Sequence, residues 1–77
     1  MQFEQRDVGP YRLYAGAREV AGQCFEGMIV VVQSTASGAK REVYRTQRFP
    51  GSRLFGSAEA ALTAAFREGG NAVRAQA

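Results

Sequence analysis

The sequence contains no histidine and no tryptophan, and Cys24 is the single cysteine among its 77 residues. Without histidine there is no histidine-based triad, general base or metal ligand. One cysteine excludes an internal disulfide and a cysteine cage for zinc or an iron–sulfur cluster. The longest apolar run, residues 28–32, is far shorter than the roughly 20 residues that cross a bilayer. Met1 is followed by Glu4 and Asp7 rather than by a basic and apolar leader. We therefore expect a cytoplasmic protein with no cofactor, no bound metal and no membrane partner.

The chain is short for a self-sufficient core. A domain of 77 residues buries only about 60–65% of the surface that its unfolded chain exposes. Disulfides and metal cages stabilise many small domains but are excluded here, so association with a partner is the remaining route. The hydrophobic share of 45% is ordinary for a globular protein, and we interpret residues 1–77 as one small domain.

Basic residues outnumber acidic ones by ten to seven, and the excess is confined to one segment. Between residues 40 and 53, five basic side chains accompany one acid, Glu42. The basic residues are Lys40, Arg41, Arg45, Arg48 and Arg53. Tyr44 and Phe49 alternate with them, and cationic groups beside aromatic rings can hold phosphates and stack bases. These five residues are the candidate contacts for RNA or DNA. The alternative is a solvated edge strand, since Arg45 and Arg48 point to opposite faces of a regular strand.

Alternation and composition predict three strands. The first covers residues 11–15, the second residues 25–33 and the third residues 41–49. The second is rich in β-branched residues and has no alternating polar position, so it should be central in the sheet with both faces covered. Residues 1–10 form a lead-in or a short edge strand near Phe3.

The segment between the first two strands allows two interpretations. Residues 16–23 either contain a turn near Gly22 or let the first strand continue through Val20. Residues 34–39 are small and polar, and they predict the hairpin loop before the third strand.

An amphipathic helix is predicted after Ser57. The Ser57 hydroxyl is a candidate N-cap, and Glu59 favours the positive N-terminus of the helix. One apolar stripe recurs at helical spacing through Ala58, Ala61, Leu62, Ala65 and Phe66. Gly69-Gly70 predicts the end of the helix after about 12 residues. Residues 71–77 then form a loose tail from which only Val73 could dock.

These elements predict an α+β domain: a three-stranded antiparallel meander sheet with one C-terminal helix packed on one face. One helix covers one face only, so the other face carries part of residues 28–32 into water. A homodimer that pairs these faces is the expected solution. The candidate interface residues are Tyr14, Met28, Val30, Val32 and Tyr44. Their placement on one face depends on register, because a slip of one residue inverts every side chain.

The order of elements resembles that of short bacterial β-β-β-α domains. In these, an aromatic-rich meander leads through a Phe–small–Ser turn into a helix that begins Ser-x-Glu-Ala-Ala. Residues 55–61, Phe-Gly-Ser-Ala-Glu-Ala-Ala, carry that likeness, which spans residues 11–70 and implies no activity. In fold alone the chain is similar to the three-stranded-sheet DNA-binding domains of integrases and of a family of plant DNA-binding proteins, which place a sheet in the major groove. It also shares strands before a helix with antitoxin domains of the HicB type. No residue motif of these families matches, so no functional residue is carried over.

No constellation of reactive side chains indicates an enzyme. Glu19, Glu26 and Glu42 are not paired at a recognisable spacing, and the sequence places no evident activating group beside Cys24. Residues 51–56 could present N–H groups to an anion at the helix start, but an ordinary strand-to-helix connection is the simpler interpretation. We expect a non-enzymatic protein-interaction or accessory module, with binding of RNA or DNA as the alternative.

Overall fold

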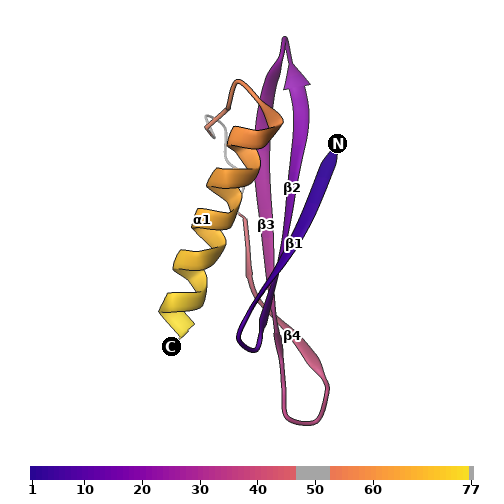
Figure 1. Ribbon diagram of the computed structural model, residues 1–77, viewed down its shortest axis with the longest axis vertical. Coiled ribbons are helices and arrows are strands. Elements are labelled where there is room, and N and C mark those ends of the chain that lie inside the picture. Colours follow the sequence, from indigo (N-terminus) through magenta and orange to yellow (C-terminus); the bar gives the residue numbers. More distant parts are fainter. Residues whose placement is uncertain (47–52, 77) are drawn as a thin grey trace.

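The computed structural model describes residues 1–46 and 53–76. Within these ranges four strands precede one helix: β1 (Gln2–Val8), β2 (Tyr11–Ala21), β3 (Cys24–Ser34), β4 (Lys40–Arg45) and α1 (Ala58–Gln76). The strands form one antiparallel sheet in the order β1-β2-β3-β4, and α1 lies along one face of it (Figure 1). The α+β class, the antiparallel sheet and the C-terminal helix are thereby confirmed.

The sheet has four strands in the described part of the chain, not the three predicted. The additional strand, β1, occupies most of the segment interpreted as a lead-in or a short edge strand. It pairs with β2 from Gln2↔Ala17 to Val8↔Tyr11 without interruption. Every β1 residue is exposed, so the strand lacks the apolar alternation by which strands are recognised in a sequence. Its pairing follows instead from the tight connection to β2 through residues 9–10.

β2 and β3 form a long hairpin at the centre of the sheet. Gly22 and Gln23 make its two-residue turn, both with left-handed backbones (φ 46° and 65°). A turn with two positive φ values matches the twist of the strands that it joins, and glycine adopts such a value without strain. Both interpretations of residues 16–23 therefore hold in part, because β2 continues through Val20 to Ala21 and then turns at Gly22.

β4 ends earlier than the strand predicted over residues 41–49. It stops at Arg45, and residues 47–49 lie outside the described residues. Its alternation is interrupted at Val43, because Val31 pairs with Tyr44 whereas Val32 pairs with Glu42. This β-bulge lets the consecutive residues Val43 and Tyr44 both pack against the core.

The core lies between α1 and the two central strands. Ile29 and Val31 of β3 are completely buried. The other buried apolar residues are Leu13, Ala15 and Ala17 of β2, and Ala61, Leu62, Ala65 and Phe66 of α1. The second predicted strand is central, as expected, but it is fully covered on the helix side only. On its other face Met28, Val30 and Val32 are half-buried.

α1 begins where the sequence predicts it. The N–H of Ala60 donates to the Ser57 hydroxyl oxygen at 3.1 Å, which confirms Ser57 as the N-cap. The predicted apolar stripe faces the sheet, and its members are buried or partly buried there. The period of the stripe was thus a sound guide to which side of the helix packs.

The prediction that the helix ends at Gly69-Gly70 is wrong, and so is the loose tail for residues 71–76. α1 has 19 residues and continues to Gln76. Gly69 faces the sheet, where a Cβ atom would lie 2.8 Å from Leu13 Cδ2 and 2.9 Å from Ile29 Cγ1. The stripe continues beyond Gly69 through Ala72 and Val73, which pack against the core. Their burial offsets the helical cost of the two glycines, about 1 kcal/mol each.

Two contacts fix the position of the start of α1 against β3. Phe25 and Phe55 exchange both backbone hydrogen bonds at 2.7 Å, which ties the chain before the helix to the edge of β3. Next to them, a Cβ atom on Gly27 would lie 2.5 Å from the carbonyl oxygen of Ala61. The helix backbone therefore touches the strand backbone directly at Gly27, and no larger residue fits there without moving α1.

Candidate interaction surface

The face of the sheet opposite α1 carries a strip of apolar side chains. The register places the side chains in neighbouring strands next to one another: Phe3 is opposite Gly16, Gly16 is opposite Met28, and Tyr14 is opposite Val30. We call this surface the helix-free face and define it by Phe3, Tyr14, Met28, Val30 and Val32. It crosses three strands, from the edge strand β1 to the central strand β3.

The strip is continuous rather than a scatter of single residues. A Cβ atom at Gly16 would lie 3.3 Å from both Phe3 Cε1 and Met28 Cγ, so these two side chains approach the bare backbone of β2 from both sides. Phe3 nevertheless remains 71% exposed and Tyr14 38% exposed. An exposed aromatic ring at the margin of a continuous apolar strip is typical of a contact surface.

Six charged residues on the same face form three ion pairs within the chain. Arg12 donates to Asp7 at 2.7 Å, Arg45 contacts Glu42 at 2.5 Å, and Arg18 forms an ion pair with Glu26. The hydrogen bond from Arg12 lowers the pKa of Asp7, and that from Arg45 lowers the pKa of Glu42. Each paired charge is thereby balanced locally, and the apolar strip lies among neutralised ion pairs.

Four of the five candidate interface residues lie on the helix-free face, but Tyr44 does not. Its ring packs against the core on the helix side, and its hydroxyl donates to a carboxylate oxygen of Glu68 in α1 at 2.5 Å. This hydrogen bond raises the pKa of the Tyr44 phenol, and partial burial adds to the effect. The bulge at Val43 explains the misplacement, since simple alternation puts Tyr44 and Glu42 on the same face.

Phe3 is the residue of this surface that the sequence did not single out. Its strand was interpreted as a lead-in or a short edge strand, so the face on which its side chain lies was open. The available signal was the aromatic residue itself, in a segment that a Gly-Pro turn connects to the next strand.

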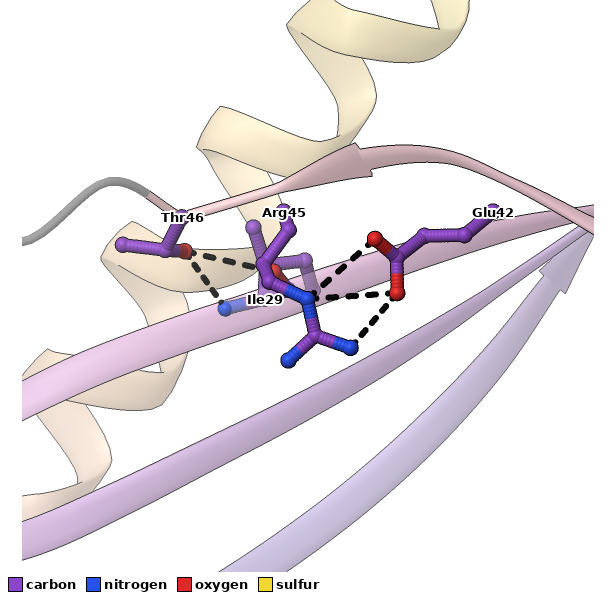
Figure 2. Close-up of polar contacts among 4 residues, drawn as sticks. All are labelled: Ile29, Glu42, Arg45 and Thr46. Atoms are coloured by element: carbon purple, nitrogen blue, oxygen red, sulfur yellow. Dashed lines mark hydrogen bonds and ion pairs between the residues drawn. The ribbon is translucent and has the colours of Figure 1, made fainter.

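Just after β4, the Thr46 hydroxyl accepts a hydrogen bond from β3 that a backbone carbonyl accepts in a regular sheet (Figure 2). The N–H of Ile29 donates to the Thr46 hydroxyl at 2.7 Å, and that hydroxyl lies 3.3 Å from the Ile29 carbonyl. The Thr46 N–H also donates to the Ile29 carbonyl, at 3.0 Å. Beside it, the Arg45 guanidinium turns back toward Glu42 through three hydrogen bonds of 2.5–3.2 Å.

The basic residues of the predicted nucleic-acid site do not share one surface. Lys40 and Arg45 lie on the helix-free face, whereas Arg41 lies on the other face and donates to Gln33 at 3.0 Å. The guanidinium of Arg53 stacks 5.0 Å from the ring centre of Phe55, and Arg48 lies outside the described residues. The pairing of Arg45 with Glu42 also removes one free cation. Contact with RNA or DNA through these residues stays a prediction.

Other arginines gather between β1 and α1, where the sequence did not predict a basic surface. Arg6, Arg67 and Arg74 border an open hollow over Phe66. The Arg6 guanidinium lies 4.0 Å from the ring centre of Phe66, so its position is set by stacking. Positive charge is therefore spread over several parts of the described surface.

The candidate reactive groups have ordinary surroundings. Glu26 and Glu42 are in the ion pairs described above, and Glu19 is exposed. Cys24 is half-buried, with its sulfur 3.9 Å from the carbonyl oxygen of Gly22. Acidic residues and Cys24 nowhere form a group of three or more that could hold a metal ion within residues 1–46 and 53–76.

No helix in the described ranges is both long enough and apolar enough to cross a membrane. Comparison of the chain with models of known families, with characterised proteins and with solved structures finds no match.

Proposed function

We propose that this protein is a small, non-enzymatic interaction module that forms a homodimer through the helix-free face. The observation that carries the proposal is the apolar strip that runs from Phe3 to Val32 with the Phe3 ring 71% exposed. Burial of such a strip removes apolar surface from water at roughly 25 cal/mol per Å². A second copy is the partner that supplies a surface of the same shape and composition, related by a two-fold axis.

The ion pairs around the strip support a face-to-face contact. Isolated charges at the centre of an interface are costly to remove from water, whereas paired ones are already partly satisfied. Asp7–Arg12, Arg18–Glu26 and Glu42–Arg45 are each complete within one chain. They can therefore form the polar rim without a matching charge on the partner. As part of the same proposal we assign the protein to the cytoplasm, where the free thiol of Cys24 stays reduced.

Sedimentation equilibrium on the wild type and two lysine variants tests the proposal. Tyr14→Lys puts a charge in the middle of the helix-free face, and we expect it to raise the dimer dissociation constant about tenfold or more. Leu54→Lys is the matched control, because Leu54 is 48% exposed, stands before α1 and is not one of the residues of the helix-free face. A wild type that stays monomeric up to about 1 mM, or equal effects of the two variants, would contradict the proposal. Melting temperatures check that both variants are folded.

A further inference from the structure

The sheet has two outer edges, and they differ in regularity. At one edge β4 is interrupted by the bulge at Val43, which is a common protection against pairing with another chain. At the other edge β1 runs from Gln2 to Val8 in unbroken register with β2. No described segment pairs with the outer side of β1. A strand edge of this kind presents a row of backbone N–H and C=O groups to a further strand.

The edge of β1 is also accessible. α1 packs across β2 and β3, and β1 is the outermost strand of the sheet, bonded to β2 only (Figure 1). All seven β1 residues are exposed. A strand added beside β1 therefore meets no other strand of the same chain within the described residues.

The charges of β1 are arranged so that the strand complements itself. Glu4 and Arg6 flank Gln5 symmetrically in the sequence Gln-Phe-Glu-Gln-Arg-Asp-Val. If two copies of β1 pair antiparallel with the two Gln5 residues opposite each other, all seven residues of each strand are paired. In that register Glu4 lies opposite the partner's Arg6, and the same contact occurs a second time by symmetry.

The neighbouring registers are unfavourable. A shift of two residues in one direction places Glu4 opposite the partner's Glu4, and a shift in the other direction places Arg6 opposite the partner's Arg6. Like charges directly opposite each other destabilise a strand pair. A shift of one residue sets side chains from opposite faces against each other. The register with the greatest overlap is thus also the one that the charges favour.

Arg6 and Glu4 share the side of the sheet on which α1 lies. The Arg6 guanidinium stacks on Phe66 of α1, 4.0 Å from the ring centre, so it lies on the helix side of the sheet. The register with β2 puts Glu4 on the same side, opposite Ala15, which faces the core. Opposite residues in an antiparallel pair have Cβ atoms about 4.5–5.5 Å apart, within reach of a Glu–Arg ion pair.

We propose that the outer edge of β1 is an interface for a second copy of this chain, paired antiparallel about Gln5 so that the two sheets join into one. Glu4 and Arg6 select the register by cross-strand ion pairs. The two interfaces share the strand of Phe3, but Glu4 and Arg6 lie on the opposite side of the sheet from the helix-free face.

Charge exchange at the two positions is the test, with sedimentation equilibrium at low salt as the measurement. Glu4→Arg and Arg6→Glu each convert both cross-strand ion pairs into like-charge pairs. We expect each to raise the dissociation constant of the edge dimer about tenfold or more. The double variant Glu4→Arg/Arg6→Glu recreates both ion pairs with reversed polarity, and it should associate within about threefold of the wild type. Glu4→Arg is the cleaner single variant, since Arg6→Glu also loses the stacking on Phe66.

Hydrogen exchange of the segment 1–8 gives a second readout. In the wild type, exchange of the outward β1 amides should slow as the protein concentration rises, and in Glu4→Arg it should not. The inference is overturned if the wild type shows no concentration-dependent protection of β1, if Glu4→Arg associates like the wild type, or if the double variant is no better than the single ones.

The two proposed interfaces fail independently. Edge pairing predicts that Tyr14→Lys leaves the protection of β1 amides at high concentration unchanged. The face dimer predicts that Glu4→Arg leaves the association through the helix-free face unchanged. If only one of the two variants weakens association, that variant identifies the interface that the protein uses.

Discussion

Gly69 and Gly70 are adjacent glycines in α1 with different surroundings. Gly69 is buried against Leu13 and Ile29, which are 2% and 0% exposed and have little room to move. Gly70 has open space, since the atom nearest to an added Cβ is Arg74 Nη1 at 3.8 Å. The two residues have the same low helix propensity, so their substitution by alanine separates helix propensity from packing.

We expect Gly70→Ala to stabilise the protein by about 0.5–1 kcal/mol, because alanine is the better helix former and meets no obstacle. Gly69→Ala gains the same propensity but forces a methyl group to 2.8 Å from Leu13 Cδ2. We expect a net loss of about 1–2 kcal/mol in the free energy of unfolding. Urea denaturation followed by circular dichroism measures both. Changes of the same sign in the two variants would show that packing at Gly69 is not the deciding factor.

At the scale of elements, one hydrogen bond joins β4 to the helix. The Tyr44 hydroxyl donates to Glu68, and this raises the pKa of Tyr44 above its usual value of 10.0. A raised pKa in the folded state means that the protonated phenol is favoured by folding. The stabilisation is complete below about pH 10 and is lost as the pH rises through the pKa of Tyr44 in the folded protein.

The variant Tyr44→Phe isolates this contribution. We expect wild type to be more stable than Tyr44→Phe at pH 8, and the difference to shrink as the pH rises above 10. Free energies of unfolding measured from pH 8 to 11 give the comparison. The variant Glu68→Gln should in turn lower the pKa of Tyr44, seen as tyrosinate absorbance at a lower pH. Parallel pH profiles for wild type and Tyr44→Phe would contradict the role assigned to this bond.

Among the elements, β2, β3 and the start of α1 could be predicted and the ends of the chain could not. A run of β-branched residues identifies β3, and the spacing from Ala58 to Phe66 identifies the packed side of α1. β1 is exposed on both faces and carries no periodic pattern, so only its partner β2 defines it as a strand. α1 continues past Gly69 because Ala72 and Val73 pack against the core, and the close approach at position 69 leaves room only for glycine.

The candidate surface was predictable to the extent that strict alternation holds. Tyr14, Met28, Val30 and Val32 lie on the helix-free face because β2 and β3 keep a regular register over that stretch. Tyr44 lies on the other face because one extra residue in β4 shifts the alternation. A bulge has no clear sequence signal, since it depends on how two strands fit each other.

On the scale of the whole molecule, helix and sheet have one shared core. The described chain is elongated, 45 × 21 × 16 Å, and every buried apolar side chain in it lies at the contact between α1 and the two central strands. An isolated helix of 19 residues that contains two glycines is marginal in water, and a sheet with one uncovered face lacks a core of its own. Each layer is therefore stable only with the other.

We expect a synthetic peptide of residues 53–77 to be largely unstructured at 25 °C, whereas the full chain unfolds in one cooperative step. Far-UV circular dichroism reports the helix content of the peptide. For the full chain, the helix signal and the near-UV signal of the tyrosines should have the same urea midpoint. A strongly helical peptide, or two separate midpoints, would show that α1 does not depend on the sheet.

The sequence by itself determined the fold class, the central place of β3, the N-cap of α1 and most of the apolar residues that one helix cannot cover. These features follow from local chemistry: β-branched residues favour extended backbone, a serine hydroxyl satisfies a free N–H, and helical spacing aligns an apolar stripe. The tertiary structure alone decided that Gln2–Val8 is a strand, that Tyr44 faces α1 and that the helix passes through two glycines. β1 depends on the backbone edge of β2, Tyr44 on the shifted register between β3 and β4, and the length of α1 on the sheet surface beside it. These contacts with neighbouring elements cannot be found from the order of residues alone.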